Sequence, residues 1–224
     1  MPRLATLAAG GASLVAAAWV ALSPDHAALP LLLAAAGLLV AGAAWLESGP
    51  GASKEIVLVA TLAAVAAAGR VLFAAIPGVQ PVTVIVVATG TALGVRAGFA
   101  TGAIAMLSSN FFLGQGPWTP WQMLLWGACG VAGAALAPLL RHRIPFAAVC
   151  FVLGFVVSAL MDVQLWVSYW PHTWGALTVV VSDGVWFDAA HAVGNVVIAL
   201  AIGPELRRLL ERYARRLRTE VVWV

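Results

Sequence analysis

Long apolar runs dominate the chain, and short polar or glycine-rich segments separate them. Eight such runs lie at residues 4–22, 28–46, 55–76, 80–95, 97–113, 121–140, 145–165 and 185–204. A helix that crosses a bilayer needs roughly 20 apolar residues, so each run is a candidate transmembrane helix. The fourth and fifth runs meet at Arg96, and we predict two short helices there because one crossing of that length would be too long. The pattern predicts an all-α, polytopic transmembrane helix bundle.

The composition excludes a soluble globular protein and a disordered chain. Of the 224 residues, 62% are hydrophobic and only 9% are charged, whereas soluble domains carry about 25% charged residues. Both cysteines, Cys129 and Cys150, lie inside apolar runs, which excludes a disulfide framework and a cysteine metal site. The single lysine, Lys54, belongs to no phosphate-binding loop motif, so the chain is not a nucleotide-hydrolysing subunit of the P-loop type.

The basic residues define one side of the membrane. Eleven of the 12 lysines and arginines lie at this side: Arg3, Lys54, Arg96, Arg141, Arg143, Arg207, Arg208, Arg212, Arg215, Arg216 and Arg218. The positive-inside rule makes this side, and with it both termini, cytoplasmic. The arginines that follow the last run fit an anionic membrane edge better than nucleic acid. We therefore expect a cell-membrane protein with outer loops near 23–27, 77–79, 114–120 and 166–184.

The order of the runs suggests four segments. They are an N-terminal transmembrane hairpin (1–48), a cytoplasmic linker (49–54), a six-helix core (55–205) and a basic cytoplasmic tail (206–224). The first run could also be a signal peptide, but its charged region is weak and a second apolar run follows at once.

Small residues recur every four positions in two places. The first set is Ala60, Ala64 and Ala68, and the second is Gly90, Gly94, Gly98 and Gly102. Such stripes allow another helix to approach closely in lipid. For the alanines, packing within the chain and docking of another membrane subunit both stay open. For the glycines we expect close packing within the chain.

Polar side chains inside the runs mark the candidate chemistry. Arg70 lies within a predicted span, where a guanidinium needs a partner or a wet cavity, and Asp162 and Asp188 lie at similar depth. Asp188, His191 and Asn195 follow helical spacing and share one face. An Asp/His pair suits a proton relay, a metal site or a ligand clamp, but the ligands for a metal are too few. We predict no metal, no cofactor and no catalytic group.

The predicted outer loops combine indoles with amides and hydroxyls. An interfacial aromatic belt explains part of this pattern, and a ring-containing, uncharged ligand with polar edges explains the rest. Gly114, Gly116, Pro117 and Pro120 are expected to hold one loop in a fixed non-helical shape. The predicted substrate-binding residues are Arg70, Gln80, Asn110, Gln115, Trp118, Thr119, Trp121, Gln122, Trp126, Asp162, Trp170, Asp188 and His191.

Residues 55–205 resemble the substrate-binding membrane subunit (S component) of energy-coupling-factor (ECF) vitamin importers. The resemblance is carried by the alanine-striped helix, by Gly69-Arg70 with the Ile76–Thr83 stretch, and by the Ser109–Met123 motif leading into Trp126-Gly127. It implies six transmembrane helices and a vitamin bound near the outer face. It also implies three partners, a transmembrane coupling subunit and two cytoplasmic ATPases, with the alanine stripe contacting the former. The subunit would then topple in the membrane to release its cargo inside.

The cargo and two rival functions stay open. The Gln115–Trp121 pattern looks most like the cobalamin-associated subgroup, while riboflavin-like and queuosine-like heterocycles are alternatives. One rival is an intramembrane enzyme acting on a lipid or isoprenoid, with Asp188 and His191 as acid and base. The other is a stand-alone ion-coupled transporter using Arg70, Asp162 and Asp188, although the two halves of the chain show no repeat symmetry.

Overall fold

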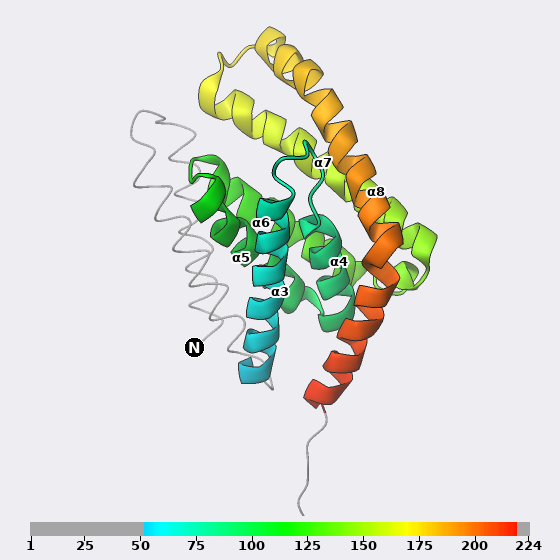
Figure 1. The fold of residues 1–224 in the computed structure, drawn as a ribbon. Coiled ribbons are helices and arrows are strands. Elements are labelled where there is room, and N and C mark those ends of the chain that lie inside the picture. The colour runs from blue at the N-terminus through cyan, green and yellow to red at the C-terminus, as the bar shows by residue number, and fades with distance from the viewer. Residues whose placement is uncertain (1–51, 219–224) are drawn as a thin grey trace, which may run out of the picture.

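The computed structural model describes residues 52–218, and every regular element in this range is a helix. The elements are α3 (Ala52–Leu72), α4 (Val82–Leu93), α5 (Val95–Leu113), α6 (Trp118–Ala135), the 3-10 helix η2 (Leu139–Arg141), α7 (Arg143–Tyr169) and α8 (Trp174–Arg218) (Figure 1). The hairpin predicted at 1–48 lies outside the described residues. The linker predicted at 49–54 is already helical from Ala52 onward.

Within residues 52–218, three helices are long and apolar enough to cross a bilayer. They comprise Lys54–Leu72, Arg143–Tyr169 and Trp174–Arg215. The apolar helix α4 has only 12 residues, about 18 Å of helix against a bilayer core of about 30 Å. Length and composition together indicate a membrane protein.

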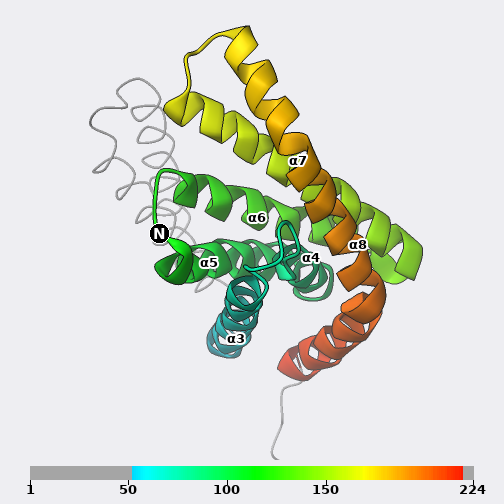
Figure 2. The same ribbon diagram turned by 45° about the horizontal axis from the view of Figure 1, so that its top comes forward.

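Helix α4 is the centre of the described bundle. All residues from Val82 to Gly90 are buried, and α4 contacts α3, α5, α6, α7 and α8. Figure 2 shows it between the α5–α6 pair and α8. Because neighbours surround it, α4 is apolar on every face rather than along one stripe. Its buried Thr89 hydroxyl donates to the Ile85 carbonyl at 2.8 Å, so this polar group is satisfied within the helix.

Glycines let α4, α5 and α6 approach closely. The chain passes from α4 to α5 at Gly94 with φ of 94°, which confirms two short helices in place of one long run. A Cβ on Gly98 would lie 2.7 Å from the Gly90 Cα and 2.8 Å from the Gly130 carbonyl oxygen. No side chain fits in this space, so the predicted close packing within the chain is confirmed for Gly90, Gly98 and Gly102. Gly94 has no atom within 4 Å of its Cβ position and serves the turn instead.

Helices α7 and α8 form an antiparallel pair, and α8 starts earlier than expected. The outer loop predicted at 166–184 is wrong, because α7 continues to Tyr169 and α8 begins at Trp174. Only residues 170–173 connect them. The segment 174–184 lacks a long apolar run, and it is helical because α7 packs along it: Gly184 lies directly against the carboxylate of Asp162.

Helix α8 also extends past the run predicted at 185–204. Its 45 residues span about 68 Å. Two ion pairs support the extension, Arg207 with Glu211 at 2.7 Å and Arg208 with Glu205 at 2.8 Å. Pairs at these spacings stabilise a helix by a few tenths of a kcal/mol each. The predicted basic tail is therefore helical as far as Arg218.

Consecutive helices run in opposite directions, so the connections gather at two ends. Residues 73–81, 114–117 and 170–173 lie at one end, here called the cavity end. The other end holds the described basic residues apart from Arg70, which reproduces the grouping expected from the sequence. The predicted loop 114–120 is shorter than expected because α6 begins at Trp118. Pro120 lies in its first turn, where a proline costs no helix hydrogen bond.

We expect Gly130→Val to destabilise the protein by about 1–3 kcal/mol, as overpacking does in other cores, because a Cβ there would collide with the Gly98 backbone. The thermal unfolding midpoint of detergent-purified protein measures this. The matched control is Ala128→Val on the exposed side of the same helix, which should leave the midpoint unchanged. Equal midpoints for the two variants would contradict the close packing.

Candidate functional site

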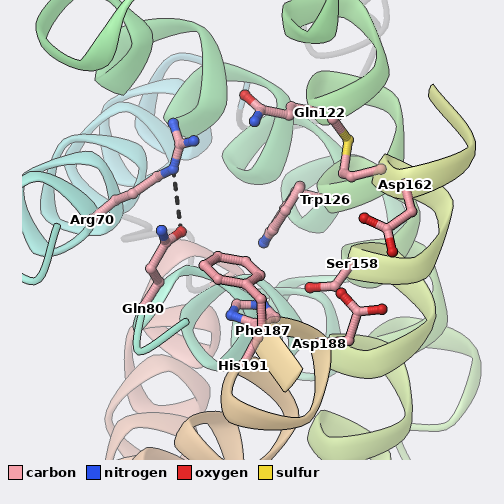
Figure 3. Close-up of a pocket in the computed structure, with 10 residues that line it drawn as sticks. Arg70, Gln80, Gln122, Trp126, Ser158, Asp162, Phe187, Asp188 and His191 are labelled. Carbon is pink, nitrogen blue, oxygen red and sulfur yellow. Dashed lines mark hydrogen bonds between the residues drawn. The ribbon is translucent and has the colours of Figure 1, made fainter. Parts of the chain in front are cut away.

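A cavity of about 140 Å³ lies between α3, α6, α7, α8 and the 73–81 connection. Its lining residues are Arg70, Gln80, Gln122, Trp126, Ser158, Met161, Asp162, Phe187, Asp188 and His191 (Figure 3). Seven of them belong to the set predicted from the sequence. Residues distant in the chain therefore meet around one volume.

Arg70 is held by neutral partners. Its side chain is only 8% exposed. Nε donates to Gln80 Oε1 at 3.2 Å, and Nη1 donates to Ser109 Oγ at 2.7 Å and to Asn110 Oδ1 at 2.6 Å. Within residues 52–218 no carboxylate forms an ion pair with this guanidinium. The two aspartates considered as partners lie across the cavity instead (Figure 3).

Asn110 connects Arg70 to helix α6. While its Oδ1 accepts from the guanidinium, its Nδ2 donates to Thr119 Oγ1 at 3.0 Å and to Gln122 Oε1 at 2.8 Å. Thr119 in turn donates to Gln115 Oε1 at 2.9 Å. Three of these predicted residues, Asn110, Thr119 and Gln115, thus support the cavity from behind and do not line it. The network fixes the orientation of each amide.

Trp126 on α6 and His191 on α8 also line the cavity and contact each other. The indole Nε1 donates to Thr83 Oγ1 at 3.1 Å, and the two rings meet edge to face at 6.1 Å. His191 Nδ1 lies 2.6 Å from the Gly78 carbonyl oxygen. A carbonyl only accepts, so Nδ1 carries a proton, and in the neutral ring Nε2 is then an acceptor. This bond ties the 73–81 connection to α8.

The predicted polar face of α8 is confirmed. Asp188, His191 and Asn195 are 2%, 2% and 0% exposed and point inward together. Asp162 Oδ2, His191 Nε2 and both amide atoms of Asn195 are buried without a partner in the described part of the chain. Asp188 and His191 make no hydrogen bond to each other there, so no acid–base pair is assembled.

Three further predicted residues, besides those of the supporting network, do not line the cavity: Trp118, Trp121 and Trp170. The Trp118 indole donates to the Gly114 carbonyl at 3.2 Å and holds the turn before α6. Trp121 neighbours Gln122 in the sequence, but successive helix positions point about 100° apart, so only one of them faces inward. Trp170 lies in the α7–α8 connection and is 42% exposed.

The sequence analysis missed four residues at or beside the cavity: Ser109, Ser158, Met161 and Phe187. A signal existed for Ser158, which stands four residues before Asp162 and so shares its helix face. Ser109 precedes Asn110, while Met161 and Phe187 are chain neighbours of the two aspartates. Nothing in the sequence distinguishes these last two from lipid-facing residues.

Comparisons of the chain with protein-family models, with curated proteins and with solved structures found no match.

We expect Asn110→Ala to lower the free energy of unfolding by about 1–3 kcal/mol, the typical cost of leaving buried polar partners unsatisfied. The change removes one acceptor from Arg70 and the donor to Thr119 and Gln122. Denaturant unfolding of the purified protein measures it. Gln115→Ala is the control, because its side chain belongs to the same network but is exposed. A larger loss for Gln115→Ala would contradict the network.

Proposed function

We propose that this protein is the substrate-binding membrane subunit of an ECF-type importer, which captures a vitamin at the extracellular face for ATP-driven uptake. The observation that carries the proposal is a buried guanidinium, Arg70, with neutral partners only, facing a polar cavity. An ionisable group inside a membrane bundle usually marks a path or site for a ligand. The resemblance of the Ser109–Met123 motif to S components supports the same assignment.

The distribution of charge supports an outward-facing cavity. The basic residues lie at the end opposite the cavity end, and the positive-inside rule places such an end in the cytoplasm. Both termini would then be cytoplasmic, and the six described α-helices would form the S-component core. Ligand would enter from outside, where the 73–81, 114–117 and 170–173 connections lie.

The alanine stripe supports a partner in the membrane. Ala60, Ala64 and Ala68 are exposed, whereas Ala63 and Ala67, which border the stripe on α3, are buried in the bundle. The stripe therefore faces away from the described core, as a smooth surface that a second helix can approach closely. We assign it to the transmembrane coupling subunit, with two cytoplasmic ATPases supplying the energy for release.

The cavity volume bears on the cargo. A cavity of about 150 Å³ accommodates a ligand of benzene size, and the cavity beside Arg70 has about 140 Å³. A corrinoid is far larger, so cobalamin requires α7 and α8 to separate from the α3–α6 side. Cobalamin stays our prediction from the motif, while the cavity in this conformation fits one ring of a smaller vitamin.

The geometry gives less support to the rival functions. For an enzyme using Asp188 and His191, no hydrogen bond among the described residues orients the two side chains toward each other, and His191 Nδ1 is bonded to Gly78. A stand-alone transporter using Arg70, Asp162 and Asp188 would need charges that exchange partners, whereas Arg70 is held by three neutral groups.

We expect Arg70→Ala and Trp126→Ala each to weaken vitamin binding at least tenfold, about 1.4 kcal/mol, because both side chains line the cavity. The measurement is calorimetric titration of detergent-purified protein with cobalamin, riboflavin, thiamine and biotin, preceded by mass spectrometry of any co-purified compound. Trp170→Ala, which changes an indole away from the cavity, should bind as the parent does. Failure of every vitamin to bind folded protein would contradict the proposal.

We expect Ala64→Leu to leave binding unchanged and to abolish uptake, since a larger side chain keeps the partner helix away. Uptake of labelled vitamin is measured in cells that express the protein with the coupling subunit and ATPases. Val65→Leu is the control, because Val65 is also exposed but lies off the stripe. Normal uptake by Ala64→Leu would place the docking face elsewhere.

A further inference from the structure

One wall of the cavity offers hydrogen-bond donors. Arg70, Gln80 and Gln122 form it, from α3, the 73–81 connection and α6. The acceptor oxygens of both glutamines are occupied, that of Gln80 by Arg70 and that of Gln122 by Asn110. Arg70 Nη2 and the two glutamine Nε2 groups donate to no described residue. These free groups are all donors.

The opposite wall offers acceptors. It comes from Asp162 and Ser158 on α7 and Asp188 and His191 on α8 (Figure 3). No hydrogen bond or ion pair to either aspartate is formed within residues 52–218. His191 is 98% buried, and its Nε2, an acceptor in the neutral ring, has no partner among the described residues. The wall therefore lacks donors from residues 52–218.

The carboxyl groups and the guanidinium lie on different walls of the cavity. Asp162 and Asp188 belong to the α7–α8 wall, while Arg70 belongs to the opposite wall and is bonded to neutral groups there. Uncompensated charge in a membrane bundle is costly. A positive charge on a ligand is therefore favoured at the α7–α8 wall, where the carboxyl groups lie.

We propose that the cavity takes a small bipolar ligand, with a cationic nitrogen against the α7–α8 wall and a hydrogen-bond acceptor against Arg70, Gln80 and Gln122. This inference rests on the proposed function and replaces the uncharged ligand expected from the sequence. Trp126 and Phe187 also line the cavity, and aromatic faces attract cations further.

The test uses three probes of similar shape: 3-(aminomethyl)pyridine, which has the amine and an acceptor nitrogen, 3-(hydroxymethyl)pyridine, which lacks the charge, and benzylamine, which lacks the acceptor. Each is titrated at millimolar concentration into purified full-length protein, and the thermal unfolding midpoint is followed. We expect the first probe to stabilise the parent most and to bind at least tenfold more tightly than the uncharged alcohol. Benzylamine should lie between the two.

Variants of the two aspartates test whether the preference for the amine depends on them and whether their charges destabilise the protein without ligand. Asp162→Asn/Asp188→Asn should abolish the preference for the amine, and it should raise the unfolding midpoint without ligand, because the uncompensated charges are removed. Asp183→Asn is the matched control, since Asp183 lies on α8 but is exposed; it should change neither property. Equal binding of amine and alcohol, or an amine preference that survives the double variant, would overturn the inference.

These outcomes are separable from those of the proposed function. Tight vitamin binding that depends on Arg70, without any preference for the amine probe, would retain the importer subunit and discard the bipolar ligand. A preference for the amine that depends on the two aspartates, without binding of any vitamin, would retain the cation site and discard the vitamin importer.

Discussion

The burial of one guanidinium governs the cavity end of this bundle. Arg70 lies in an apolar helix and is 8% exposed, so its donors must find acceptors inside the protein. Gln80, Ser109 and Asn110 supply them. Satisfying Arg70 therefore brings α3, the 73–81 connection and α5 together, and Asn110 extends the network to α6. Because these partners are neutral, they do not neutralise the positive charge of Arg70 as a carboxylate would. The charge therefore remains available to a ligand.

The glycine contacts make this arrangement possible. Gly90, Gly98 and Gly130 bring three helix backbones into contact, so that α4, with its fully buried Val82–Gly90 segment, fits at the centre. Interiors this tightly packed tolerate little change in volume. The tightly packed α3–α6 part of the bundle consequently fixes the positions of Arg70, Gln80 and Gln122 in the cavity wall.

Helices α7 and α8 contribute the opposite chemistry. They pack on each other along their length, and they present the aspartates and His191 to the cavity. Two of the buried atoms without a partner in the described chain, Asp162 Oδ2 and His191 Nε2, lie on this wall. These unpartnered groups are the physical basis of the ligand that we propose.

The sequence by itself determined the helical membrane class, the division of residues 80–113 into two short helices, the shared face of Asp188, His191 and Asn195, and most of the cavity lining. These follow from local properties, namely apolar length and helical spacing. The tertiary structure alone decided that Arg70 pairs with Ser109 and Asn110, that α8 begins at Trp174, and that Trp118 and Trp121 turn away from the cavity. Such features depend on which groups from distant parts of the chain meet, and the spacing of residues along one helix carries no information about the helix that packs against it.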